Sequence, residues 1–213
     1  MPALLRSTLL AEGNTDEALC FILTWLLVWH AQHWDVDKTR LVEAEKLDDI
    51  PKKYLAARMR RAYNLYPCEI LFVHRDADSS DPKSRHAEIE RAYQKVQTQI
   101  STCIAVVPVQ ETEAWLLFNE EAIRQAAGNP KGQAPLDLPT MKGIEKLRDP
   151  KERLYAILKK ASMYHDKLPR DFNPIQRAKR IVDDRTDFAP LRALTAFRNL
   201  EQAIKAIVQE QHW

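Results

Sequence analysis

Short apolar runs that end abruptly at acidic or turn-forming residues alternate with helical patterns between residues 4 and 127. The clearest run is Cys68–Val73, which stops at the polar stretch His74–Pro82. Such a run of β-forming residues, bounded by turn residues, is typical of a buried strand. Strands that alternate with helices favour a parallel sheet with helices on both faces, joined by right-handed crossovers. The sequence therefore predicts an α/β fold.

The same pattern gives the order of the elements. We expect strands at 4–11, 39–44, 68–73 and 102–107, and helices at 18–29, 51–63, 83–99 and 113–127. Beyond Gly128, helical stretches near 144–163 and 174–209 follow without a clear strand. We expect an α/β domain at 1–128 and a helical C-terminal extension at 129–213. The extension should pack against the sheet layer, because so short a segment rarely builds a core of its own.

Composition narrows the class of protein but not its function. The chain has 213 residues, 45% hydrophobic and 29% charged, which is ordinary for a globular protein, and its net charge of +2 argues for no particular partner. Its three cysteines lie in apolar runs without paired spacing, which favours reduced thiols. The apolar segment Leu19–Trp29 is too short to span a bilayer, and no signal-peptide pattern precedes it. We therefore expect a cytoplasmic protein without a membrane partner.

Acidic residues follow three of the expected strands. Glu12 follows the first strand, Asp76 and Asp78 follow the third, and Glu113 follows the fourth. Ligands of open parallel sheets bind beyond the carboxyl ends of the strands. Magnesium prefers hard oxygen ligands, and one or two carboxylates with water and a substrate phosphate suffice. We therefore expect Glu12, Asp76 and Asp78 to meet at one sheet edge and to hold Mg²⁺ or Mn²⁺.

Several of these residues also have structural explanations. Acidic residues are common at helix starts, so Asp16 could complement a helix dipole, or it could contact the site residues without touching the metal or substrate itself. Glu113 could complete the metal site or merely open a helix. Arg75 and His74 lie beside the acidic pair and could contact a phosphate, although a residue at the end of a strand more often points into a helix layer. We do not assign His74 to the site.

The motif Glu12-Gly13-x-Thr15-Asp16 after an apolar strand, followed by Asp76-x-Asp78 after another, resembles the Toprim domain. That family includes topoisomerases, primases, small RNA-maturing nucleases and the overcoming-lysogenization-defect nucleases. The resemblance implies a Toprim-like, Rossmann-like fold. It also implies that Glu12 is a general acid or base and that Asp76 and Asp78 are metal ligands. We further expect Gly13 and Arg75 to lie beside the substrate.

A third motif extends the resemblance to about residues 4–127. The stretch 107–117, VPVQETEAWLL, is similar to bacterial Toprim-like proteins grouped as the domain of unknown function DUF4276. This resemblance implies a link to nucleic-acid cleavage and phage defence, with an ATPase or another defence-system protein as a partner.

Three functions remain open on the sequence. The first is a metal-dependent phosphodiesterase or nuclease acting on DNA or RNA. The second is a non-catalytic Toprim-like subunit that binds nucleic acid or a partner protein, and the third is a metal-dependent nucleotide-sugar transferase. Basic residues cluster at 52–61 and 177–180, but a solvated helix face explains each cluster as well as a phosphate track does. The sequence leaves the substrate and the oligomeric state open.

Overall fold

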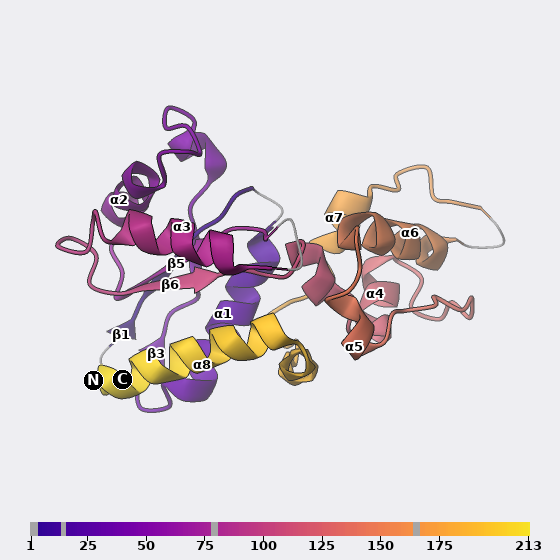
Figure 1. Cartoon of the computed structure of the whole chain (residues 1–213). Coiled ribbons are helices and arrows are strands. Elements are labelled where there is room, and N and C mark those ends of the chain that lie inside the picture. Colours follow the sequence, from indigo (N-terminus) through magenta and orange to yellow (C-terminus); the bar gives the residue numbers. More distant parts are fainter. Residues whose placement is uncertain (1–3, 14–15, 78–80, 164–166) are drawn as a thin grey trace.

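A computed structural model describes residues 4–13, 16–77, 81–163 and 167–213. Its centre is a four-stranded parallel sheet in the order β4-β2-β5-β6 (Figure 1). The strands are β2 (Ser7–Leu10), β4 (Arg40–Leu41), β5 (Ile70–His74) and β6 (Cys103–Val106). The predicted α/β class, a parallel sheet flanked by helices, is confirmed.

Alternating side chains along the central strands bury both faces of the sheet. In β5, Ile70 and Phe72 join one apolar cluster, whereas Leu71 and Val73 join a second cluster on the opposite face. All five residues of the strand are buried. A strand covered on both sides by helices reads as a continuous apolar run, which is why this strand was prominent in the sequence.

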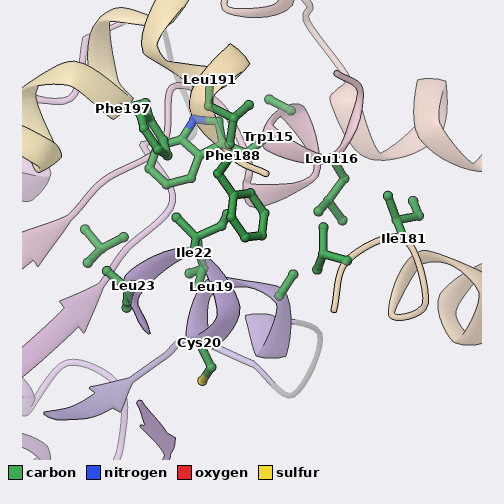
Figure 2. Packing of buried hydrophobic residues seen from close by; sticks show 14 of the residues in the cluster. Leu19, Cys20, Ile22, Leu23, Trp115, Leu116, Ile181, Phe188, Leu191 and Phe197 are labelled. Atoms are coloured by element: carbon green, nitrogen blue, oxygen red, sulfur yellow. The ribbon is translucent and has the colours of Figure 1, made fainter. Parts of the chain in front are cut away.

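Two pairs of helices cover these faces. The helices α1 (Glu17–His30) and α8 (Thr195–Glu210) share the first cluster with the sheet, and α2 (Leu55–Leu65) and α3 (Lys83–Tyr93) share the second. In the first cluster, Leu19, Ile22 and Leu23 of α1 lie near Trp115 and Phe197 (Figure 2). The rings of Trp115 and Phe197 meet edge to face, with centroids 5.5 Å apart.

The remaining elements are short. Near the sheet, β1 (Leu4–Leu5) pairs in parallel with β3 (Asp35–Val36), and η2 (Ala44–Leu47) precedes α2. After β6 come η3 (Thr112–Leu116), α4 (Glu120–Ala126), α5 (Met141–Ile144), α6 (Pro150–Ser162), α7 (Pro174–Ala178) and η4 (Ala189–Ala193). The helices α4 to α7 form a group beside the sheet, and α8 then returns across it to lie beside α1 (Figure 1).

Several predicted elements are divided in the structure. The strand predicted at 4–11 is interrupted at Arg6, and the helix predicted at 83–99 ends at Tyr93. The helix predicted at 113–127 is instead η3 followed by α4, because the side chain of Asn119 accepts a hydrogen bond from Ala122 N and starts a new helix. The helix predicted at 174–209 is likewise three elements, α7, η4 and α8.

The part of the chain predicted as an extension contributes to the core of the sheet. Leu200 and Ile204 of α8 are buried in the same cluster as Ile104 and Val106 of β6. In the described part of the chain, no helix combines the length and the apolar character that crossing a membrane requires.

Candidate functional site

The predicted acidic residues gather at the carboxyl ends of three neighbouring strands. Glu12 follows β2, Asp76 follows β5, and Glu113 lies in η3, which follows β6. Because β2, β5 and β6 are parallel neighbours, their carboxyl ends share one edge of the sheet. Asp78 lies outside the described residues, so its position in the site stays a prediction.

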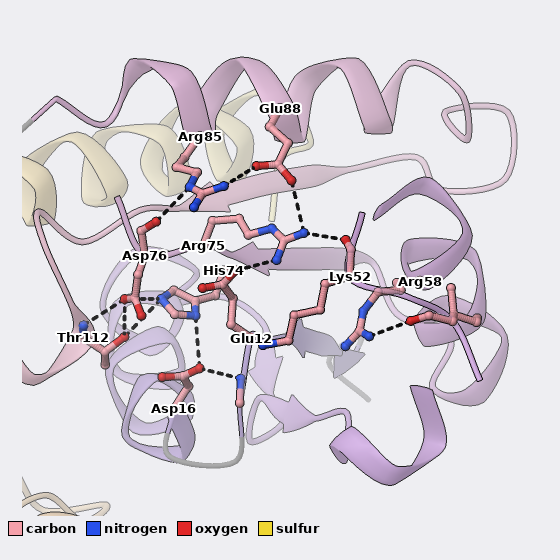
Figure 3. Close-up of polar contacts among 12 residues, drawn as sticks. Glu12, Asp16, Lys52, Arg58, His74, Arg75, Asp76, Arg85, Glu88 and Thr112 are labelled. Carbon is pink, nitrogen blue, oxygen red and sulfur yellow. Dashed lines mark hydrogen bonds and ion pairs between the residues drawn. The ribbon is translucent and has the colours of Figure 1, made fainter. Parts of the chain in front are cut away.

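A buried histidine lies between two carboxylates at this edge. The side chain of His74 is fully buried, with Nδ1 3.2 Å from Asp16 Oδ2 and Nε2 3.2 Å from Asp76 Oδ1 (Figure 3). Thr112 closes the network, because its backbone N–H donates to Asp76 Oδ1 over 3.0 Å and its hydroxyl lies 3.1 Å from His74 Nε2. His74 thus joins the end of β5 and the start of η3 to the start of α1.

The charges in this network stabilise one another. Burial opposes protonation of His74, but its contacts with Asp16 and Asp76 outweigh burial and raise its pKa to about 9. Burial likewise opposes ionisation of Asp16, but its interactions with His74 and the Gly13 N–H lower its pKa below the ordinary value. The network is therefore an imidazolium held between carboxylates at neutral pH.

A second network surrounds Arg75, which is buried. One guanidinium nitrogen lies 2.5 Å from Glu12 Oε1. The other lies 3.1 Å from Glu88 Oε1 and donates to the backbone oxygen of Lys52 over 2.9 Å. These three contacts fix the guanidinium from different elements, so Arg75 in turn fixes the carboxylate of Glu12 (Figure 3).

Glu113 is the third carboxylate at this edge. It is buried, and burial together with the negative charges of Glu111 and Asp76 raises its pKa, although Lys151 opposes the rise. Lys151 Nζ lies 3.4 Å from Glu113 Oε1. Glu111 accepts a hydrogen bond from the backbone N–H of Lys151, at the start of α6. Glu113 and Asp76 thus lie at the same edge of the sheet, and the negative charge of Asp76 contributes to the raised pKa of Glu113.

The described residues supply some, but not all, of the ligands that a divalent cation requires. Asp76 and Glu113 supply hard carboxylate oxygens, and Mg²⁺ often takes only one or two of these from the protein. Among the described residues, however, no three His, Cys, Asp or Glu side chains are grouped so that they could hold a metal together. A complete metal site therefore depends on Asp78 or on a bound phosphate.

The sequence did not single out the two residues that organise the site. Asp16 was open between two roles. It precedes α1, where the helix dipole favours an anion, and it also contacts His74, so its role behind a functional site stays a prediction. The side chain of His74 points into the helix layer. It contacts the carboxylates of Asp16 and Asp76 there, and its raised pKa favours the protonated imidazole. The available signal was a histidine at the end of a fully apolar strand, where an uncompensated polar side chain would be costly.

Gly13 contributes through its backbone. Its N–H donates to Asp16 Oδ2 over 3.1 Å, so the turn after β2 is tied to the start of α1. This bond links the position of Glu12 to that of the histidine network.

Comparisons of this chain with protein-family models, with curated proteins and with solved structures give no match.

Proposed function

We propose that this protein is a metal-dependent phosphodiesterase that cleaves DNA or RNA, with a Toprim-like arrangement of its site. The observation that carries the proposal is the convergence of Glu12, Asp76 and Glu113 from three different strand ends on one edge of the sheet. Sites of open α/β sheets lie at such edges. Burial is the largest cause of the raised pKa of Glu113, and a bound cation would favour the ionised form of this carboxylate.

The proposed metal ligands are Asp76, Glu113 and Asp78. The hydrogen bond from the Thr112 N–H orients Asp76 by its Oδ1 atom, and the structure records no described protein partner for Oδ2. A bound Mg²⁺ or Mn²⁺ would stabilise negative charge on the scissile phosphate. His74 keeps Asp76 in place from the protein interior.

Glu12 is the proposed proton acceptor for the attacking water. Its Oε1 atom is held by Arg75, and the side chain as a whole is only partly exposed, at 21%. Holding a general base in one orientation reduces the entropy that the reaction would otherwise lose. Arg75 thus acts as a positioning residue in this proposal, because both of its terminal guanidinium nitrogens are engaged by Glu12, Glu88 and Lys52. Its buried Nε has no hydrogen-bond partner among the described residues.

One observation favours the alternative of a non-catalytic subunit that binds nucleic acid or a partner protein, such as an ATPase of a defence system. The described carboxylates at the edge already have cationic partners: Arg75 for Glu12, His74 for Asp76 and Lys151 for Glu113. A site whose charges are compensated internally can be structural alone. The cleavage experiment separates the two functions.

The test is cleavage of labelled single- and double-stranded DNA and RNA in Mg²⁺ and in Mn²⁺, at low salt. We expect Glu12→Gln to lower the rate by a factor on the order of 10² to 10⁴, the usual effect of losing a general base. We expect Asp76→Asn to abolish metal-dependent cleavage. Glu210→Gln, which makes the same chemical change at an exposed position on α8, serves as the control and should cleave normally.

Two results would reject this mechanism. Cleavage that is undiminished by Glu12→Gln would remove Glu12 from the chemistry. Failure of the wild-type protein to cleave any of the four substrates, while it still binds one of them, would favour the non-catalytic subunit.

A further inference from the structure

A cleft of about 650 Å³ lies between α2 and α3, on the second face of the sheet. Four cationic side chains line it: Lys53 before α2, Arg60 on α2, Arg91 on α3 and Lys95 just after α3. The cleft thus gathers positive charge from two helices that are distant in sequence. The basic cluster seen in the sequence at 52–61 forms only one of its walls.

These four cations have no carboxylate partner in the described part of the chain. Arg60 donates to the amide oxygen of Gln99, and Lys53 lies 5.1 Å from the ring centroid of Tyr54. By contrast, Arg61, the next residue on α2, pairs with Asp49 over 2.8 Å. Uncompensated cations around a concave surface concentrate an electrostatic field that attracts anions.

The cleft has one acidic lining residue, Glu88, and its charge is already shared with two other cations. Glu88 lies 3.1 Å from Arg75 and 3.0 Å from Arg85. The cleft therefore keeps its positive character. The same contact connects the cleft to the sheet edge, because Arg75 also holds Glu12 (Figure 3).

An exposed aromatic ring lies among the cations. Tyr54 is 54% exposed and lines the cleft beside Lys53. An aromatic ring among cationic side chains is the combination that binds single-stranded nucleic acid, where the cations contact phosphates and the ring stacks on a base. In a duplex the faces of the bases are covered by their neighbours, and an acidic peptide has no base to stack.

We infer that the cleft between α2 and α3 binds single-stranded nucleic acid, with phosphates at Arg60, Arg91 and Lys95 and a base on Tyr54. Binding in the cleft stands apart from catalysis. The further step, that the bound strand leads past Glu88 to Glu12, rests on the proposed phosphodiesterase function.

The experiment measures the affinity of a fluorescent oligothymidylate for the protein over a range of salt, in EDTA so that cleavage does not interfere. We expect Arg91→Gln/Lys95→Gln to weaken binding and to reduce the slope of log affinity against log salt by about 0.7 for each phosphate that the variant no longer neutralises. The control is Lys131→Gln/Lys205→Gln, which removes the same charge from exposed positions elsewhere and should leave the slope unchanged.

The stacking interaction is tested at Tyr54, whose exposed side chain can be replaced without disturbing the core. Tyr54→Leu should weaken oligothymidylate binding by roughly 5- to 150-fold, whereas Tyr54→Phe, which keeps the ring face, should bind nearly as the wild type does. Equal weakening in both variants would overturn the stacking assignment.

The outcomes separate this inference from the proposed function. Binding that depends on Arg91, Lys95 and Tyr54 without any cleavage would support the cleft and reject the phosphodiesterase. If Arg91→Gln/Lys95→Gln binds and cleaves nucleic acid as the wild type does, the cleft is not the binding site, whereas the proposed phosphodiesterase function still stands. Polyglutamate is an alternative anionic ligand, so its affinity is measured in the same variants. If it binds as tightly as the oligonucleotide and depends on the cations but not on Tyr54, the ligand of the cleft is an acidic protein and the assignment of nucleic acid is rejected.

Discussion

At the scale of single residues, His74 connects charged groups that belong to different elements of the fold. It is completely buried, and its ring bridges carboxylates that precede α1 and follow β5. Removing one member of a buried charge network leaves the other charges uncompensated. The resulting loss of folding free energy exceeds the net stabilisation that the intact network provides. The histidine therefore couples the integrity of the site to the stability of the chain.

This coupling predicts a pH dependence of stability. The pKa of His74 is raised from 6.5 to about 9 in the folded state, so its contribution is complete below pH 6.5 and is lost as pH rises through about 9. The rise corresponds to a free energy on the order of 3 kcal/mol. Urea unfolding in EDTA at several pH values between 6 and 9.5 measures this change in the free energy of unfolding.

The comparison variant is His33→Gln, which changes an exposed histidine. Its free energy of unfolding should decrease between pH 6.5 and pH 9 by the same amount as that of the wild type. In His74→Gln the free energy of unfolding should be lower throughout and should no longer fall over this range. A wild-type stability that is constant from pH 6.5 to pH 9 would show that the imidazole is neutral in the fold.

Residue types at strand ends were enough to predict that Glu12 and Asp76 would share one edge of the sheet, but not the contacts that their side chains make. Glu12 and Asp76 follow neighbouring strands, and this could be inferred because parallel strands end at one edge. The pairing of Glu12 with Arg75, and of Asp16 with His74, depends on side-chain directions and on how far α1 stands from β5. Such distances are set by packing across the whole cluster, which has no local signature in the sequence.

At the scale of elements, α8 is the helix that joins the C-terminal part of the chain to the sheet. Its buried residues Phe197, Leu200 and Ile204 share a cluster with α1 and β6. The ring of Phe197 packs edge to face on Trp115 of η3. The helix therefore contacts the sheet and the segment that carries Glu113 at the same time.

Removing the ring at this junction should destabilise the whole fold. Phe197→Ala leaves a cavity among fully buried side chains and should lower the free energy of unfolding by about 3–5 kcal/mol. Ile175→Ala, at a 45% exposed apolar residue of α7, should change it by no more than about 0.5 kcal/mol. Denaturant unfolding of both variants gives the comparison. Unfolding confined to the C-terminal helices, with an intact sheet, would contradict a shared core.

The elements that sequence patterns located best are those with the strongest periodicity. The strand at β5 and the helix α1 were found within a few residues, because both are apolar over most of their length. The predictions failed where polar contacts decide the boundary, as at Asn119, whose side chain caps α4. Hydropathy alone does not distinguish a 3₁₀ turn followed by a new helix from one continuous helix.

At the scale of the whole molecule, a bound cation should be visible as global stabilisation. A ligand that binds only the folded state stabilises it by about 2.7 kcal/mol at a concentration of one hundred times its dissociation constant. We therefore expect Mg²⁺ or Mn²⁺ to raise the melting temperature of the wild type. Asp76→Asn/Asp78→Asn should abolish this rise, and Glu210→Gln should keep it. An equal rise in the Asp76→Asn/Asp78→Asn variant would place the ion elsewhere on the protein.

The return of α8 across the sheet also sets the order in which the chain can fold during synthesis. The strands and α1 leave the ribosome long before Thr195, yet Ile104 and Val106 of β6 share their apolar cluster with residues of α8. Contacts between segments so distant in sequence make folding slow, and an apolar face that waits for its cover is open to association with other chains. The sheet surface that α8 covers is therefore open to such association until α8 has been synthesised.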